Sequence, residues 1–189
     1  MRRLLWISTI VCLVALACFQ VPLGDSARSR VDHRLDGVWL SASDSGDEYE
    51  AYFVVPFDER VDCLMLAKFE IENGELKQRV LHVARAWTTE IGAATFVSFE
   101  RIAQMLPKFD GLRSFVNARL EFAPDGTLVA RSLAYAKAGL RGVKSAEELT
   151  RLIAGRLDDS ALFEEPVKFH RPDPANAIER KIRDQFLNN

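Results

Sequence analysis

Apolar and polar side chains alternate most regularly between residues 61 and 86. Because successive side chains of a β-strand point to opposite faces, this alternation predicts strands with one apolar face. The dipeptide Asn73-Gly74 interrupts the pattern and is typical of a type I′ turn, so the segment predicts a hairpin with residue 72 opposite residue 75. The apolar face of its first strand consists of Val61, Cys63, Met65, Ala67, Phe69 and Ile71.

The turn also sets the register that we expect along the whole hairpin. Cross-strand pairs contribute about 0.2–1 kcal/mol each, and a slip of one residue would exchange the polar and apolar faces. The expected pairs are Phe69 with Gln78, Met65 with His82, Asp62 with Arg85, and Lys68 with Arg79, of which the last brings two like charges together.

Other segments of the chain complete a mainly β fold. Pro124-Asp125-Gly126 predicts the turn of a second hairpin. Ser145 and Glu148 fit a helix capping box, and Asp173-Pro174 is typical of a helix start. We therefore expect an α+β fold dominated by strands: an antiparallel meander forming a barrel or strongly curved sheet, with C-terminal helices near residues 145–157 and 174–187. The expected strands are residues 37–40, 48–55, 61–72, 75–86, 93–99, 116–122, 128–135 and 166–170, with a short helix at residues 100–106.

The first residues of the chain have the pattern of a secretory signal. Two arginines precede an apolar run, Leu4–Ala17, which is shorter than the roughly 20 residues that a membrane-spanning helix needs. An uncleaved anchor extending to Leu23 is the alternative, which Gln20 and Pro22 disfavour. We therefore expect residues 1–17 to be a signal peptide.

The stretch Val14-Ala15-Leu16-Ala17-Cys18 resembles the lipobox of bacterial lipoproteins. In that family the cysteine is lipidated on its sulfur and becomes the mature N-terminus, so the resemblance implies that Cys18 holds the protein on a membrane. The commonest lipobox has Leu three residues before the cysteine, where this chain has Ala15. Ala15-Leu16-Ala17 also fits the A-x-A site of an ordinary signal peptidase, in which case Cys18 is only the first residue after cleavage.

The lipobox resemblance also implies a compartment. Proteins of this class carry three acyl chains, whereas a single chain gives only reversible membrane binding. Residue 19 is Phe and not the Asp of an inner-membrane retention signal, so we expect a lipoprotein of the cell envelope, attached to the outer membrane or facing the periplasm. Residues 18–34 are then the lipidated N-terminus and a flexible tether, followed by a single β-rich domain at residues 35–189. Cys63 either remains a buried thiol or, if Cys18 is not lipidated, pairs with Cys18.

Composition excludes several classes of function. With 25 Lys and Arg against 27 Asp and Glu, the chain has a formal net charge of −2 and offers no electrostatic case for nucleic-acid binding. The glycine-rich signatures of nucleotide binding are absent from the sequence. His33, His82 and His170 do not fall in a metal-binding array, so we expect no metal and no cofactor.

Gly37-x-Trp39, at the start of the first predicted strand, resembles the opening of the lipocalin-like small β-barrels, the calycins. In that family the tryptophan closes one end of a barrel whose interior can bind an apolar ligand. The resemblance implies that inward-facing side chains here either line a cavity or simply fill the core. The candidate lining residues are Trp39, Tyr52, Met65, Phe69 and His82.

These observations favour a noncatalytic β-domain, tethered to a membrane through lipidated Cys18, that binds a small apolar ligand or an envelope protein. One alternative is a secreted or periplasmic enzyme whose active site is assembled from scattered residues. A purely structural interaction module is the other alternative, and it would have a solid apolar interior.

Overall fold

The computed structural model describes residues 21–101, 115–140 and 142–187. The predicted signal peptide, Cys18 and most of the short helix expected at residues 100–106 lie outside these ranges. Among the described residues, no helix combines the length and the apolar character required to cross a membrane.

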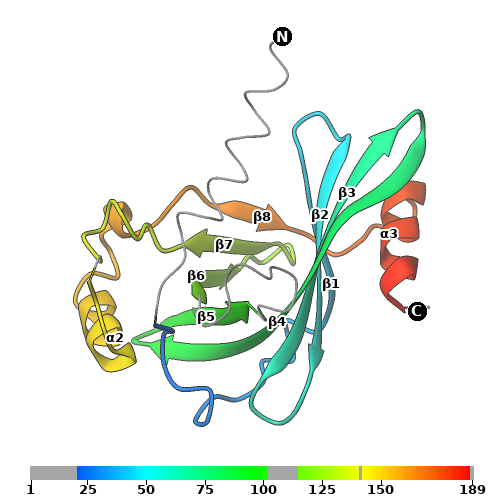
Figure 1. Ribbon diagram of the computed structural model, residues 1–189. Coiled ribbons are helices and arrows are strands. Elements are labelled where there is room, and N and C mark those ends of the chain that lie inside the picture. Colours follow the sequence, from blue (N-terminus) through cyan, green and yellow to red (C-terminus); the bar gives the residue numbers. More distant parts are fainter. Residues whose placement is uncertain (1–20, 102–114, 141, 188–189) are drawn as a thin grey trace, which may run out of the picture.

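In the described part of the chain, eight strands follow one another in order, and each pairs antiparallel with the next, as predicted for a meander (Figure 1). Leu40 in the first strand and His170 just after the last exchange two backbone hydrogen bonds of 2.9 Å, so the sheet curves into a nearly closed barrel. The predicted mainly β fold is therefore confirmed. The strands are β1 (Gly37–Ala42), β2 (Glu48–Pro56), β3 (Asp62–Glu72), β4 (Glu75–Ile91), β5 (Ala94–Arg101), β6 (Phe115–Phe122), β7 (Leu128–Ser132) and β8 (Val167–Phe169).

Among the described residues, two α-helices and one short 3₁₀ helix follow β7, and the α-helices lie on opposite sides of the barrel (Figure 1). The predicted cap of the first α-helix is present, because Ser145 Oγ accepts a hydrogen bond of 3.1 Å from the N–H of Glu148. The carboxylate of Glu148 in turn accepts a hydrogen bond from the N–H of Lys144. The helices are α2 (Ala146–Ala154), η2 (Ser160–Leu162) and α3 (Ala177–Leu187).

The hairpin of β3 and β4 keeps the predicted register only near its turn. Phe69 pairs with Gln78 as expected, but a β-bulge then shifts the pairing, so that Met65 lies opposite Val83 and not opposite His82. The predicted register is therefore wrong beyond the bulge. The shift separates Lys68 from Arg79, whose like charges would repel each other as direct partners.

The separated charges find partners of opposite sign. Lys68 Nζ lies 2.7 Å from the carboxylate of Glu50 on β2, and Arg79 Nε lies 2.8 Å from the carboxylate of Glu70. Arg79 also contacts the carboxylate of Glu72. One extra residue in β4 thus replaces a repulsive pair with three attractive ones.

The wall of the barrel is buried on its outer face as well as on its inner face. On one side, Ile182 and Phe186 of α3 pack on β1 to β3, and the Phe186 ring lies 6.2 Å from that of Phe69 and 5.5 Å from that of Phe53. On the other side, α2 covers a second outer cluster that includes Trp87, Phe96 and Phe115. Both faces of several strands are therefore apolar, so alternation alone does not show which face is inside.

The segment before β1 does not extend freely as a tether, because Leu23 is fully buried on the outside of the barrel. The backbone N–H of Leu23 donates to Ser98 Oγ at 2.9 Å and to Asn117 Oδ1 at 3.1 Å. Its carbonyl accepts a hydrogen bond of 3.0 Å from Trp87 Nε1. These contacts across β4, β5 and β6 fix residues that composition alone assigns to a flexible linker, because the polar groups that hold them are distant in sequence.

Candidate functional site: the interior of the barrel

The barrel contains a partly open cavity of about 130 Å³, to which each of the strands β1 to β8 contributes side chains. Its lining is mainly aliphatic and aromatic, with a few polar groups. Ala86, Ala118 and Ala130 occupy inward positions, and their small side chains leave the space that larger ones would fill. The remaining lining residues are Leu35, Trp39, Glu50, Tyr52, Val54, Asp62, Leu64, Val97, Phe99, Leu120, Leu128, Ser132, Val167 and Phe169.

The size of the cavity limits what it can hold. An engineered cavity of about 150 Å³ binds benzene, whereas pockets for drug-sized molecules measure roughly 300–1,000 Å³. A space of about 130 Å³ therefore suits one small molecule and is too small for a complete long acyl chain. The interior is neither solid nor wide.

Trp39 lies at the end of the cavity that residues 32–36 cover, and it is held on several sides. Its indole Nε1 donates a hydrogen bond of 2.8 Å to the carbonyl of Leu35, and the guanidinium of Arg171 stacks 3.7 Å from the ring centre. Arg171 also donates to the carbonyls of Asp36 and Arg34, at 2.5 and 2.9 Å. Burial lowers the pKa of Arg171, although a guanidinium stays charged at neutral pH. These contacts fasten the chain before β1 across this end of the barrel.

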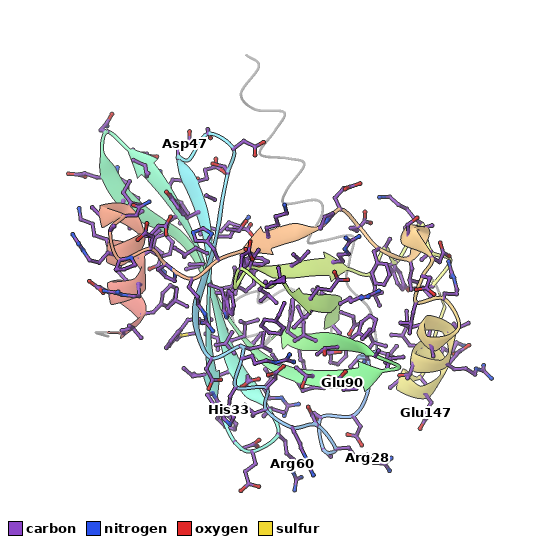
Figure 2. The ribbon with its side chains drawn as sticks, turned by 180° about the vertical axis from the view of Figure 1, so that it is seen from behind. Arg28, His33, Asp47, Arg60, Glu90 and Glu147 are labelled. Atoms are coloured by element: carbon purple, nitrogen blue, oxygen red, sulfur yellow. The ribbon has the colours of Figure 1, made fainter. Side chains whose placement is uncertain are left out.

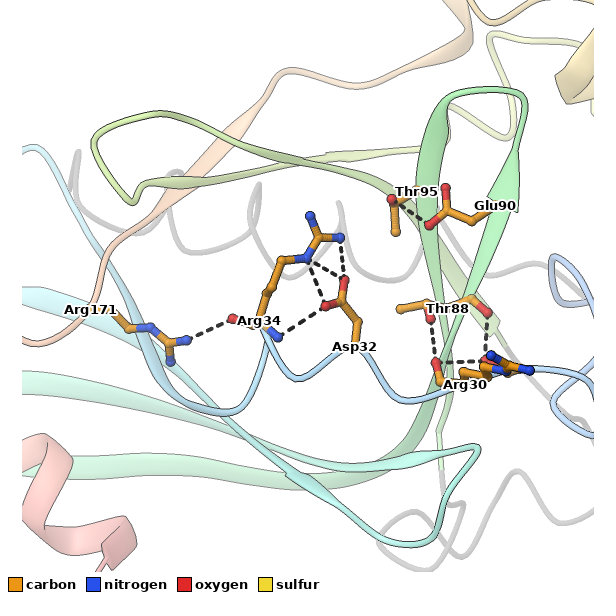
Figure 3. Close-up of polar contacts among 8 residues, drawn as sticks. Arg30, Asp32, Arg34, Thr88, Glu90, Thr95 and Arg171 are labelled. Carbon is orange, nitrogen blue, oxygen red and sulfur yellow. Dashed lines mark hydrogen bonds and ion pairs between the residues drawn. The ribbon is translucent and has the colours of Figure 1, made fainter.

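Arg34, at the same end, has its charge matched within the segment. Its guanidinium contacts both carboxylate oxygens of Asp32, at 2.9 and 2.6 Å for the closest pairs, and stacks 4.4 Å from the ring centre of Phe122. Figure 3 shows Arg34 folded back onto Asp32, with Arg171 reaching the backbone of Arg34. The hydrogen bonds from Arg34 lower the pKa of Asp32.

Asp62 is the unusual member of the lining. Asp62 is only 2% exposed, and its Oδ1 has no hydrogen-bond partner among the residues that the structure describes. Burial, followed by the negative charge of Asp36, raises the pKa of Asp62 to about 6. The carboxyl group is therefore largely ionised at pH 7 but takes up a proton in mildly acidic solution.

Asp36 and His33 lie near Asp62 on the segment that covers this end of the barrel. His33 Nδ1 and Asp36 Oδ2 are 2.9 Å apart, and the contact raises the pKa of His33. The other oxygen of Asp36 is buried without a partner. In Figure 2, His33, Arg28, Arg60 and Glu90 lie along the same end of the molecule. This end therefore combines carboxylates with an exposed imidazole.

The structure brings two of the five sequence-predicted lining residues into the cavity. Trp39 and Tyr52 line it, and the Tyr52 ring lies 5.0 Å from that of Phe169 in an edge-on arrangement. His82 pairs with Leu66 on the inner side of β4 but lies outside the set of side chains that line the cavity. Phe69 is 1% exposed but packs on the outer face beneath α3. Met65 alternates with inward-facing Leu64 and so belongs to the outer face as well.

Asp62 was not among the predicted lining residues, because the alternation places it on the other face of the strand from Cys63 and Met65, paired with Arg85. In the structure Asp62 pairs with Ala86, and Arg85 Nη2 instead lies 2.9 Å from the carboxylate of Glu100. One signal was present in the sequence: Leu64 and Leu66 make the nominally polar face apolar as well. A strand with two apolar faces leaves the inward face undetermined.

A larger, open groove of about 950 Å³ lies outside the barrel, between residues 24–34, the end of β4 and α2. Its lining carries both signs of charge, and Glu90 and Glu147 in Figure 2 mark two of its sides. Glu90 accepts a hydrogen bond of 2.8 Å from Thr95, and the backbone carbonyl of Arg30 accepts one from Thr88 Oγ1 (Figure 3). The groove is thus larger and more open than the barrel interior, and a greater share of its lining is polar.

The histidine, cysteine and acidic side chains within residues 21–101, 115–140 and 142–187 form no group of three that could hold a metal ion. Cys63 is half-buried and forms no disulfide with any described residue, and burial raises the pKa of its thiol. Comparison of the chain with models of known families, with curated proteins and with solved structures found no match. The nearly closed barrel is nevertheless compatible with a lipocalin-like architecture.

Proposed function

We propose that the protein is an exported lipoprotein, held on a membrane of the cell envelope by lipidated Cys18, whose barrel binds a small apolar ligand. The observation that supports ligand binding is the apolar cavity of about 130 Å³ inside the barrel. Transfer of an apolar molecule from water to such a space is favoured by about 25 cal/mol per Å² of buried apolar surface. Binding of a protein partner on the outer surface is the alternative.

Ligand-observed NMR with benzene tests the cavity directly. We expect saturation transfer from the protein to benzene, and loss of that transfer in Ala118→Leu, which places a larger side chain in the cavity. Ala42→Leu, at an exposed position of β1, is the matched control and should leave the transfer unchanged. Equal transfer in both variants would place the ligand elsewhere and refute interior binding.

Metabolic labelling with palmitate tests the tether. We expect label on the full-length protein and none on Cys18→Ala, because the lipid chains are attached through residue 18. Cys63→Ala, which removes the half-buried thiol of β3, is the control and should keep the label. Equal labelling of wild type and Cys18→Ala, or no labelling of either, would exclude the lipoprotein assignment.

The geometry near Asp62 supports one second candidate, a hydrolytic enzyme. General acid–base chemistry uses carboxylates and imidazoles, and this end of the barrel has Asp62, Asp36 and His33. The pKa of Asp62, about 6, lies close to the neutral pH at which such a catalyst works best. Hydrolysis of p-nitrophenyl acetate between pH 5 and pH 8 tests this candidate. A rate that Asp62→Asn lowers at least tenfold would favour the enzyme, whereas equal rates for the two proteins would exclude catalysis of ester hydrolysis by Asp62.

A further inference from the structure

One buried carboxylate of the described residues, that of Glu179, has hydrogen-bond partners for both of its oxygens. Glu179, which is 7% exposed, accepts hydrogen bonds from the backbone N–H of Asp173 at 2.8 Å and from Asn176 Nδ2 at 3.1 Å. Its Oε2 also lies 3.2 Å from His170 Nε2. Asp62 is more deeply buried than Glu179, yet its Oδ1 has no partner. Because an unpaired buried polar group is destabilising, this carboxylate requires an explanation other than structural support.

The groups around Asp62 increase the negative charge at this end of the cavity. Asp36, Asp32 and Asp58 all raise the pKa of Asp62, and His33 is the neighbouring group that lowers it. His33 itself faces solvent and contacts Asp36. A cation placed beside Asp62 would therefore interact favourably with several carboxylates, whereas an anion would be repelled.

Three arginines near this end are already engaged with other groups. Arg34 contacts Asp32, Arg171 stacks on Trp39 and donates to backbone carbonyls, and Arg85 contacts Glu100. Each of these contacts is favourable. A guanidinium group that turned toward Asp62 would lose its present contact, so the gain would be offset by that loss. The protein thus leaves the Asp62 carboxylate available to a group that enters the cavity.

We infer that the cavity binds a small apolar amine, with its ammonium group at Asp62 and its hydrocarbon part among Trp39, Tyr52 and Phe169. This inference rests on the proposed binding of a ligand inside the barrel and adds the chemical class of that ligand. The aromatic side chains can pack against a hydrocarbon chain, and the faces of their rings also attract a cation. The small volume limits the ligand to roughly the size of benzene. Fatty acids and other small carboxylates are disfavoured, since their negative charge would be repelled by that of Asp62.

Titration calorimetry with butylamine, butanol and butyrate at pH 7.5 separates charge from apolar size. We expect butylamine to bind about 10- to 100-fold more tightly than butanol, because charge-assisted hydrogen bonds are the stronger kind, and butyrate to bind most weakly. Asp62→Asn should remove the advantage of the amine and leave butanol unaffected. Asp44→Asn, in the exposed loop between β1 and β2, is the matched control.

The pH dependence of the wild-type protein provides a test that needs no variant to fold. Butylamine binding should weaken as the pH falls through the pKa of Asp62, by about tenfold per pH unit below 6, while butanol binding stays constant. Asp36, Asp32, Asp58 and His33 are the charged groups that act on the pKa of Asp62.

Two failures have different meanings. If butanol or butyrate binds as tightly as butylamine, or if the affinity for butylamine is independent of pH, the inference about amines is overturned and binding in the barrel stands. If neither butylamine, butanol nor benzene binds, the proposed ligand-binding function fails together with the inference.

Discussion

Asp62 provides the sharpest prediction about stability, because a carboxyl group whose pKa is higher in the folded protein than in the unfolded chain destabilises the fold when it ionises. The folded pKa is about 6, against a reference of 3.8. At about 1.36 kcal/mol per pKa unit, the difference corresponds to a ceiling of about 3 kcal/mol. The isosteric variant Asp62→Asn removes the charge but keeps a polar group in the same buried place. We therefore expect a gain of only about 1–2 kcal/mol at pH 7.

The sign of the pH dependence follows from linkage. Below pH 3.8 the carboxyl group is protonated in both states and does not disfavour folding. Between pH 3.8 and pH 6 the unfolded chain loses its proton first, so the wild-type protein loses stability as the pH rises. The advantage of Asp62→Asn should accordingly be small near pH 4, grow through this window and become constant above about pH 6.5.

Urea denaturation followed by circular dichroism at several pH values between 4 and 8 measures this difference. Asp44→Asn controls for the loss of one negative charge from the surface and should show the wild-type profile. A constant difference between Asp62→Asn and the wild type across the whole pH range would show that Asp62 does not titrate near pH 6. A loss of stability at pH 7 would show that the carboxylate supports the fold, which contradicts the structure as we interpret it.

The remaining predictions concern the packing that shapes the barrel. Leu23→Ala should lower the free energy of unfolding by about 2–5 kcal/mol, because the Leu23 side chain is fully buried. Leu187→Ala, at a side chain that is 57% exposed, should change the free energy of unfolding little. Equal effects of the two substitutions would mean that the N-terminal segment is not docked on the barrel. Ile182→Ala should have a similar cost, and full stability in this variant would argue against packing of α3 on the barrel. Arg171→Met should cost about 1–3 kcal/mol and change the fluorescence of Trp39, since it removes the stacked guanidinium and its hydrogen bonds; an unchanged emission spectrum would contradict the contact.

Some features of the fold depend only on neighbouring residues, and these were predicted correctly. Asn73-Gly74 forms the expected turn, with Glu72 opposite Glu75 and both turn residues at positive φ. Ser145 caps α2 as its spacing to Glu148 indicates. Alternation over β3 and β6 correctly identified strands, because the two-residue period is a property of the extended backbone itself.

Features that depend on distant residues were not predicted. Residues 21–34 dock on the barrel because Ser98 and Asn117, on β5 and β6, supply the matching hydrogen bonds. The register of β3 and β4 changes at the bulge because Lys68 and Arg79 separate and find carboxylates on other parts of the sheet.

The sequence by itself determined the antiparallel order of the strands, the turn at Asn73-Gly74, the helix start at Ser145 and the tryptophan that lies inside the barrel, whereas β4 continues to Ile91, beyond its predicted end at residue 86. Only the tertiary structure decided which face of each strand points inward. The physical reason is that α3 buries Phe69 from outside while the barrel buries Leu64 from inside, so hydrophobicity is nearly equal on the two faces of β3. Because this face of β3 points inward, Asp62 lies in the cavity. Its carboxylate, which the sequence alone places in a charged pair with Arg85, is the most distinctive group of the candidate site.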